Sequence, residues 1–187
     1  RPLKNWYSPA DLIDTLSQDI EAATKRLEEE SFEYNFHLRP YQKKAIQAVE
    51  SALAEDARAL LLAMATGTGK TKTSIALVYR LLKTKRFRRI LFPVDRTALG
   101  EQAGNAFKDT RMESLQTFAD ILDIKELKDT EPDRDTKVHI ATIQGIVKRL
   151  LYPSDDAITL TAGQYDCIVV DECHRGYLLD REMSEAE

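Results

Sequence analysis

Residues 64–72 read MATGTGKTK, a run of small side chains that ends in a lysine and a threonine. An apolar run at 59–65 leads into it and an amphipathic stretch at 72–83 follows, so we expect a strand, a glycine-rich loop and a helix in that order. Gly67 and Gly69 would let backbone amides approach phosphate oxygens, and the start of the helix would direct its positive dipole end at the same anion. This order of elements predicts a phosphate-binding loop.

The residue types at the end of the loop suit a triphosphate and its metal ion. Lys70 is expected to contact the β- and γ-phosphates, and the hydroxyl of Thr71 is expected to ligate Mg²⁺. The rest of the expected phosphate-binding set is Thr66, Gly67, Thr68 and Gly69. Loops of this kind usually have one more glycine, at the position that Met64 occupies here. The alternative is a surface loop that contains the letters GKT by chance.

A second group of chemically active side chains ends the apolar run at 167–170. A buried parallel strand delivers its carboxyl end to the crevice where ligands bind in such sheets. Asp171 would hold Mg²⁺ through water, and Glu172 would orient or deprotonate the water that attacks the γ-phosphate. An acidic pair at this place favours hydrolysis, because a small-molecule kinase must keep water out. The two groups together predict a hydrolytic ATP site.

Cys173 and His174 follow the acidic pair. Nothing near Cys173 in the sequence would lower its pKa or complete a set of metal ligands. His174 is expected to couple the ATP site to other parts of the protein, because it lies next to the acidic pair. The second cysteine, Cys167, forms no disulfide framework with the first, which is typical of a protein from a reducing cytoplasm.

The elements that must position these residues follow an alternating pattern. Short apolar runs predict buried strands at 59–65, 89–94, 137–143 and 165–172. Amphipathic stretches between them predict helices at 72–83, 97–108 and 144–151. Apolar strands that alternate with helices pair in parallel and are covered on both faces, so we expect an α/β three-layer sandwich with a mostly parallel sheet. Residues 120–136 are polar and are expected to form a surface insertion.

The part of the chain before residue 38 has a different pattern. Ser8 and Pro9 suit the start of a helix over 8–30, whose expected inward side chains are Leu12, Leu16, Ile20 and Leu27. A second helix is expected over 39–55 with Tyr41, Ala45, Ala48, Val49 and Leu53 inward. The polar and aromatic residues at 31–37 mark a boundary. We therefore predict a helical linker segment at 1–37 and an ATP-binding lobe at 38–187.

Composition limits the class of protein. The 187 residues are 43% hydrophobic and 31% charged, enough for one sizeable core, and no apolar stretch is long enough to span a membrane. The net charge of −4 argues against strong autonomous binding of nucleic acid but not against a groove shared with other domains. The sequence starts at Arg1 and ends in REMSEAE, so we expect a segment of a longer, cytoplasmic polypeptide.

These motifs resemble those of the superfamily 2 helicases and translocases. TGTGKT is similar to their motif I, and DECH at 171–174 to their motif II. Residues 38–46, LRPYQKKAI, resemble their adenine-recognition segment, which implies that Gln42 bonds the base edge and that Arg39 or Tyr41 flanks it. Residues 91–102 resemble motif Ia and residues 138–146 the next motif, which implies that Arg96, Thr142 and Gln144 contact the nucleic-acid backbone. The resemblance implies the first RecA-like lobe of such an enzyme.

MATGTGKT, VDRTALGEQ, ATIQGI and VVDECHRG together look like the motor (R) subunit of type I restriction enzymes, in which Met commonly occupies the place of Met64. The resemblance implies an endonuclease domain before this segment, a second lobe after it, and methyltransferase and specificity subunits as partners. Such a motor uses ATP and Mg²⁺ to pump duplex DNA before cleavage. Because the arginine finger of the second lobe is worth roughly 10³–10⁵ in rate, we expect this segment alone to bind ATP weakly and hydrolyse it slowly.

Two other classes remain open. One is another superfamily 2 enzyme, such as a repair or RNA helicase, although DECH and VDRTAL favour DNA over RNA. The other is a nucleotide-binding scaffold or small-molecule kinase, which would leave Gln42, Arg96 and Thr142 without a role. The triplet at 126–128, ELK, has the spacing of a nuclease signature, but we assign it to the polar insertion.

Overall fold

The fold is built on a four-stranded sheet in the order β4-β5-β1-β6. The computed structural model describes residues 9–94, 97–113, 116–117, 124–125, 135–151, 160–161, 163–171 and 173. The strands are β1 (Ile90–Val94), β4 (Ile124–Lys125), β5 (Val138–Thr142) and β6 (Cys167–Ile168), and every pairing between them is parallel. The predicted α/β class with a parallel sheet is confirmed.

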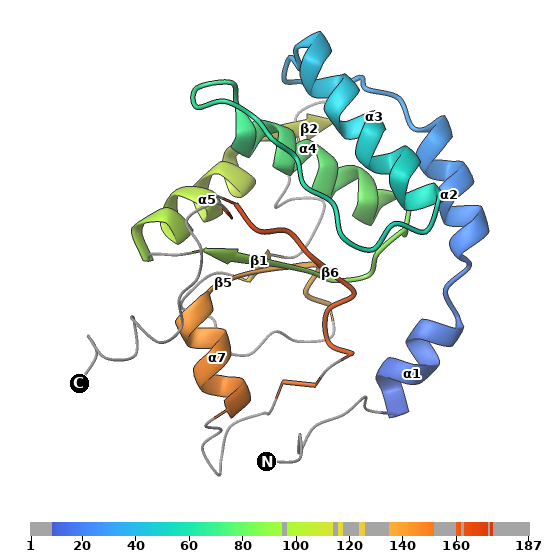
Figure 1. The fold of residues 1–187 in the computed structure, drawn as a ribbon, viewed down its shortest axis with the longest axis vertical. Coiled ribbons are helices and arrows are strands. Elements are labelled where there is room, and N and C mark those ends of the chain that lie inside the picture. The colour runs from blue at the N-terminus through green and yellow to red at the C-terminus, as the bar shows by residue number, and fades with distance from the viewer. Residues whose placement is uncertain are drawn as a thin grey trace.

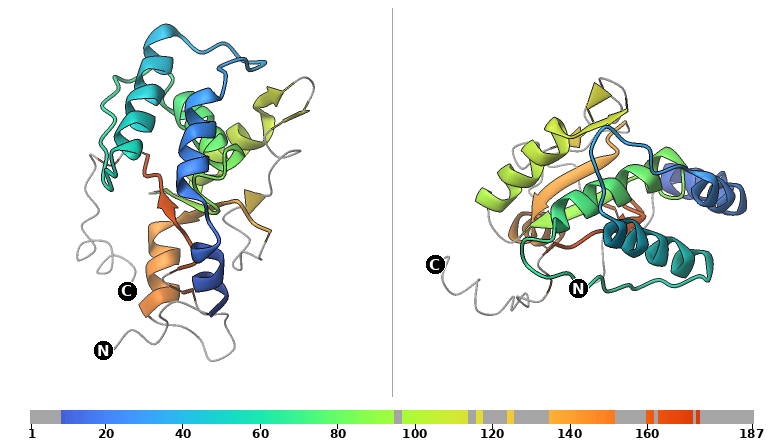
Figure 2. Two further views of the ribbon diagram at one scale, coloured as in Figure 1. Left: turned by 90° about the vertical axis from the view of Figure 1, so that its right-hand side faces the viewer. Right: turned by 90° about the horizontal axis from the view of Figure 1, so that it is seen from above.

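Helices cover both faces of this sheet. The helices α4 (Lys70–Lys83) and α5 (Thr97–Asp109) lie on one side, and α7 (Ile143–Leu151) lies on the other (Figures 1 and 2). Each of these three helices lies where its apolar periodicity predicts it. The predicted three-layer arrangement of a RecA-like lobe is therefore observed. A short antiparallel pair, β2 (Arg111–Glu113) with β3 (Gln116–Thr117), was not predicted.

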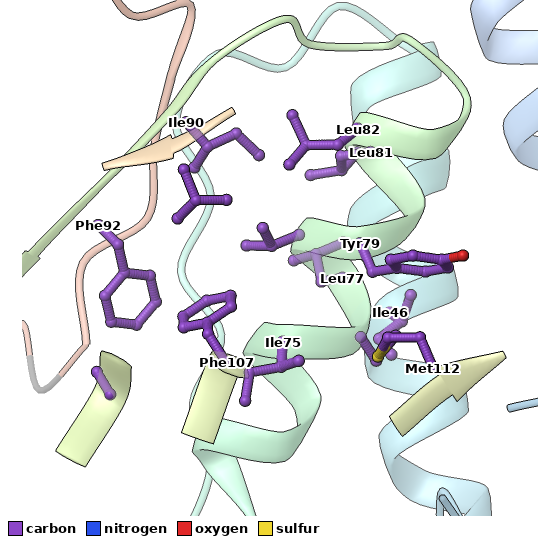
Figure 3. Close-up of a cluster of buried hydrophobic side chains, with 14 of the residues drawn as sticks. Ile46, Ile75, Leu77, Tyr79, Leu81, Leu82, Ile90, Phe92, Phe107 and Met112 are labelled. Carbon is purple, nitrogen blue, oxygen red and sulfur yellow. The ribbon is translucent and has the colours of Figure 1, made fainter. Parts of the chain in front are cut away.

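The main core lies between α4 and the sheet. The apolar face of α4 is buried against β1, and Figure 3 shows Leu81 and Leu82 beside Ile90. Phe92 of β1 meets Phe107 of α5 edge to face, with 5.3 Å between the ring centroids. Short, continuously apolar strands such as β1 thus find helices on both faces, as parallel sheets require.

The start of β6 is fixed to the start of β1 by a carboxylate. Asp166 accepts hydrogen bonds from the backbone N–H groups of Arg88 and Arg89, at 2.8 and 2.9 Å. Pairing follows at once, with Ile90 opposite Cys167 and Leu91 opposite Ile168. Pro93 lies within β1 beyond this short ladder, where it cannot donate a hydrogen bond to a neighbouring strand.

The predicted strand at 59–65 is absent, which corrects the sequence analysis. Residues 57–65 form no regular element, and the side chains of Leu60, Leu61 and Leu62 are exposed, Leu61 by 80%. β6 is also shorter than predicted, it lies at the edge of the described sheet, and its Ile168 is 61% exposed. Apolar composition predicts a tendency to be buried, but a strand also needs a hydrogen-bonded neighbour.

The predicted N-terminal helix over 8–30 is two helices, α1 (Pro9–Leu16) and α2 (Ile20–Glu29). Asp19 has an extended backbone and accepts a hydrogen bond from the N–H of Ala22 at 2.9 Å, so it ends one helix and caps the next. The predicted inward face is right only for Leu27, because Leu12, Leu16 and Ile20 are exposed.

The helix α3 (Pro40–Ala54) confirms the predicted second helix, and its expected inward face is right in part. Val49 and Leu53 pack against the core as expected. Gln42 and Ile46 are buried instead of Tyr41 and Ala48, which were expected inward and are exposed. The reason is that Gln42 faces the glycine-rich loop, as described below.

Residues 30–39 connect α2 to α3, and Phe32, Tyr34 and Phe36 among them pack against the core. The division at residue 37 therefore stays a prediction. Within the expected surface insertion, Ile124 and Lys125 form β4 at the edge of the sheet, while the triplet at 126–128 lies outside the described residues. No described helix combines the length and the hydropathy that a membrane span requires.

Candidate nucleotide site

The carboxyl ends of three strands lie at one edge of the sheet because the strands are parallel. β1 ends at Val94, which is opposite Thr142 at the end of β5. The residues after β6 run in the same direction to Asp171. In open parallel sheets, ligands bind outside this edge.

The glycine-rich loop lies between residue 65 and the start of α4. Gly67 and Gly69 have φ angles of 79° and 82°, a left-handed conformation that side chains other than glycine rarely adopt. The loop is closed by Thr68, whose N–H and hydroxyl both donate to the carbonyl of Ala65. Gly69 precedes α4 and offers no side-chain cap to its first N–H groups. These amides, together with the helix dipole, favour an anion at this place.

The start of α3 fixes this loop through hydrogen bonds. The amide of Gln42 donates to the carbonyls of Thr68 and Gly69, at 3.1 and 3.2 Å, and the hydroxyl of Tyr41 donates to Thr68 at 2.8 Å. Gln42 itself is oriented by the N–H of Arg39, which donates to its side-chain oxygen at 2.8 Å. The approach is close: a Cβ atom on Gly69 would lie 2.6 Å from Gln42 Nε2. The three residues predicted for adenine recognition thus meet at the loop.

Lys70 and Asp171 line one cavity of about 1130 Å³. Met64, Ser74 and Cys173 also line it, as do the exposed leucines of the 57–65 segment. The structure therefore brings together the predicted phosphate lysine and the first predicted carboxylate, from positions far apart in the sequence. Glu172 and His174 lie outside the described residues.

Thr66 is exposed and Thr71 is half-buried at the start of α4. A threonine hydroxyl and a carboxylate such as that of Asp171 are the hard oxygen donors that Mg²⁺ prefers. In the described part of the chain, no group of three or more His, Cys, Asp or Glu residues could hold a metal by itself. These donors therefore fit a metal ion that is held mainly by a nucleotide and water.

The residues expected to contact DNA are only partly described. The hydroxyl of Thr142 accepts a hydrogen bond from the N–H of Gly145 at 3.1 Å, so it caps the start of α7. Gln144 is exposed at the same edge of the sheet. Arg96 lies outside the described residues, two positions beyond the end of β1.

Two ionisable groups beside the cavity are unsuited to proton transfer near neutral pH. Burial raises the pKa of the Tyr165 hydroxyl to about 12. Burial, and then the charge of Asp166, raise the pKa of the Cys167 thiol to about 12. Neither group would be ionised at neutral pH.

Sequence reasoning missed a buried ionic group behind the site. Arg80 of α4 is 1% exposed and bonds Glu50 of α3, the hydroxyl of Tyr34 and carbonyls at the end of α2. The available signal was an arginine within the apolar run at 77–82, LVYRLL, on a helix expected to be buried. A charged side chain that is buried at that position requires a counter-charge and hydrogen-bond acceptors.

Comparison with known proteins shows the family of the chain. The family model described as "Type III restriction enzyme, res subunit" matches residues 35–182. The EcoKI type I restriction enzyme endonuclease subunit of Escherichia coli K12 is 46% identical over the whole chain, which covers 16% of that relative. The EcoAI endonuclease subunit of Escherichia coli is 36% identical over 141 residues, 74% of this chain and 16% of that relative.

A third relative is the SsaAORF53P type I restriction enzyme endonuclease subunit of Staphylococcus saprophyticus, 28% identical over 148 residues, 76% of this chain and 15% of that relative. The chain thus spans about one sixth of the length of these relatives. The resemblance to superfamily 2 motors of restriction enzymes is confirmed, and the chain belongs to the family of the type III restriction enzyme res subunit.

Proposed function

We propose that this chain is the first ATP-binding lobe of the motor subunit of a type I restriction enzyme, which hydrolyses ATP to drive duplex DNA translocation before cleavage. The observation that carries the proposal is the cavity shared by Lys70 and Asp171, beside a glycine-rich loop that α3 holds in place. The names of the relatives, all type I endonuclease subunits, support the assignment to a restriction system.

ATP would bind with its phosphates on residues 66–71. The N–H groups of the loop and of the first turn of α4 would surround the phosphate oxygens, and Lys70 would neutralise the β- and γ-phosphates. Gln42 and its neighbours Arg39 and Tyr41 would receive the adenine. The amide of Gln42 already bonds the loop, so a contact between Gln42 and the base would depend on the position of the loop.

Mg²⁺ would be held by Thr71 and, through water, by Asp171, and it would neutralise charge that develops on the phosphates. Glu172 would orient the attacking water and accept its proton. The raised pKa values of Tyr165 and Cys167 are consistent with this assignment, because neither group would compete as a base near neutral pH.

DNA would be contacted through its phosphates by Arg96, Thr142 and Gln144, near the carboxyl edge of the sheet. Such contacts are independent of sequence and weaken with salt. His174 would couple them to the ATP site. Sequence choice would belong to the methyltransferase and specificity partners, in the cytoplasm.

ATP hydrolysis by the full-length polypeptide tests the proposal. We would measure it with duplex DNA, single-stranded DNA and RNA, each with and without the methyltransferase and specificity subunits. We expect turnover that needs duplex DNA and the partners. Lys70→Ala should lower it by about 10²–10³-fold, as the loss of a donor to developing charge does. Lys72→Ala is the matched control, because Lys72 follows on the same helix turn and lies over the ring of Phe36 instead.

Other outcomes identify the alternatives. Turnover on single strands or RNA without partners would indicate an autonomous helicase. Turnover that ignores nucleic acid, and that Arg96→Ala leaves unchanged, would indicate a non-motor nucleotide-binding protein. Brisk hydrolysis by the 187-residue chain alone would contradict the expectation that a second lobe is needed.

A further inference from the structure

The guanidinium of Arg80 lies at the meeting point of three helices. It is 1% exposed, and each of its nitrogens donates to an acceptor. Nη1 donates to the carbonyls of Glu30 and Ser31, both at 2.8 Å, and Nη2 donates to the carbonyl of Leu27 at 3.0 Å. Nε and Nη2 also bond the carboxylate of Glu50. All of the acceptors are therefore on α2, its C-terminal continuation or α3.

The carbonyl acceptors are those that a helix leaves unpaired at its C-terminus. α2 ends at Glu29, so the carbonyls of Leu27 and Glu30 lie at its negative dipole end, where a cation is favourable. The arrangement is reciprocal, because Arg26 of α2 donates to the carbonyl of Thr84 at the end of α4, at 3.1 Å. Each helix thus supplies an arginine to the end of the other.

Aromatic side chains enclose the charge. The centroid of the Phe32 ring lies 4.0 Å from Arg80 Cζ, and the hydroxyl of Tyr34 accepts a hydrogen bond from Arg80 Nη1 at 3.2 Å. Tyr34 stacks on Phe36 and meets Tyr79 of α4 edge to face. A planar arginine can serve all these partners at once, whereas lysine has neither the planar shape nor five donors.

The contacts of Arg80 with α3 connect it to the nucleotide loop. Glu50 bonds Arg80, and Gln42, eight residues earlier on α3, bonds the carbonyls of Thr68 and Gly69. Eight residues of helix span about 12 Å, so α3 is a short rigid element that is fixed to α4 at one end and to the loop before α4 at the other. Figure 1 shows α3 lying alongside α4, with α2 next to it.

We propose that Arg80 is a positioning residue of the nucleotide site: through Glu50 it fixes α3 against α4, so that Gln42 holds the glycine-rich loop in its left-handed conformation. The same guanidinium fastens α2 and the aromatic residues 32–36 to the lobe. The functional meaning rests on the proposed function, since the loop it positions is the one assigned to ATP.

Amide hydrogen exchange on the full-length polypeptide, without nucleotide, tests this coupling. Two amides are suitable probes: that of Thr68 in the loop donates to the carbonyl of Ala65, and that of Thr73 in the first turn of α4 donates to the carbonyl of Gly69. Glu50→Gln removes the negative charge that Arg80 contacts on α3. It leaves intact the hydrogen bonds from Arg80 to the carbonyls at the end of α2. We expect exchange in the peptide 66–75 to rise about tenfold in Glu50→Gln, as local opening becomes easier, while peptide 20–34 is unchanged. Arg80→Met should accelerate both.

Lys83→Met is the matched control, because Lys83 is on the same helix and bonds Glu30 at a more exposed place. It should leave exchange in 66–75 at the wild-type rate. A folded Glu50→Gln protein, judged by circular dichroism, whose 66–75 exchange equals that of the wild type would overturn the proposal. So would an equal acceleration by Lys83→Met.

Binding of a fluorescent ATP analogue to the same proteins separates this inference from the proposed function. We expect Glu50→Gln to weaken binding and Lys83→Met to leave it unchanged. A wild-type protein that does not bind the analogue would contradict the proposed function, whereas faster loop exchange in Glu50→Gln would still support the positioning by Arg80.

Discussion

The two sides of α4 differ in how completely they are packed. The side that faces α2 and α3, here called the closed side, holds Arg80 at 1% exposure with all its nitrogens bonded. Another side, here called the open side, faces the cavity between residues 57–65 and β6, where Leu61 is 80% and Ile168 61% exposed. A charge is buried and leucines are exposed, the reverse of what residue type alone indicates.

The difference between the two sides shows how directional hydrogen bonds and non-directional apolar burial each determine a structure. Hydrogen bonds to a guanidinium are directional, so Arg80 determines where α2 and α3 lie. Apolar burial is non-directional, so the leucines at 60–62 favour burial without choosing a neighbour. The nucleotide loop lies where the two sides meet, at the start of α4. It is supported by α3 on the closed side and borders the cavity on the open side.

The largest effect should follow from breaking the closed side. Arg80→Met leaves the carboxylate of Glu50 buried without its cation, and the loss of one partner of such a pair costs about 3–5 kcal/mol of unfolding free energy. Lys83→Met removes an exposed pair and should cost no more than about 1 kcal/mol. Urea denaturation of both variants measures the difference. Equal costs would mean that the closed side is not the stronger one.

Thiol labelling tests how completely the cavity wall is packed. Cys167 and Cys173 both line the cavity, but Cys167 packs against the core and burial raises its pKa to about 12, whereas Cys173 is exposed. Because only the thiolate reacts, iodoacetamide at pH 8 should modify Cys167 at least about 100-fold more slowly than Cys173. Mass spectrometry of the peptides gives both rates. In guanidinium chloride the rates should become equal, and equal rates in the folded protein would mean that the core does not protect Cys167.

A matched pair of glycine substitutions tests the junction of the two sides. Gly67→Ala and Gly69→Ala each force a side chain into the left-handed region, at about 1–2 kcal/mol. A Cβ at Gly67 meets nothing within 4 Å among the described atoms, whereas one at Gly69 would displace Gln42. Gly69→Ala should therefore cost about 0.5–1.5 kcal/mol more unfolding free energy for each hydrogen bond that Gln42 loses. A larger loss in Gly67→Ala would contradict the support of the loop by Gln42.

The smallest effect is expected on the open side. Leu61→Ser removes an exposed side chain and should change the unfolding free energy by no more than about 0.5 kcal/mol. Leu81→Ala, on the buried face of α4, should cost about 2–5 kcal/mol. Thermal or chemical unfolding compares them. A loss of several kcal/mol in Leu61→Ser would show that residues 59–65 are packed in solution, as their sequence predicted.

The sequence was sufficient for features that depend on local spacing. The helices α4, α5 and α7 and the strands β1 and β5 lie where apolar periodicity predicts them. The left-handed Gly67 and Gly69 follow from the loop motif, since a backbone that must approach an anion requires glycine. The cavity that joins Lys70 to Asp171 follows from the rule that parallel strands present their carboxyl ends at one edge.

Other features depended on contacts between distant residues. The break at Asp19, the buried Gln42 and the exposed leucines at 60–62 all contradict readings based on apolar faces. The partners of Arg80 lie 30 to 53 residues away in the sequence. Sequence by itself determined the class of fold and the phosphate-binding loop, because these depend on local backbone geometry and periodicity. Only the tertiary structure decided which side of α4 is closed, because the partners of a buried charge are set by directional bonds across the fold.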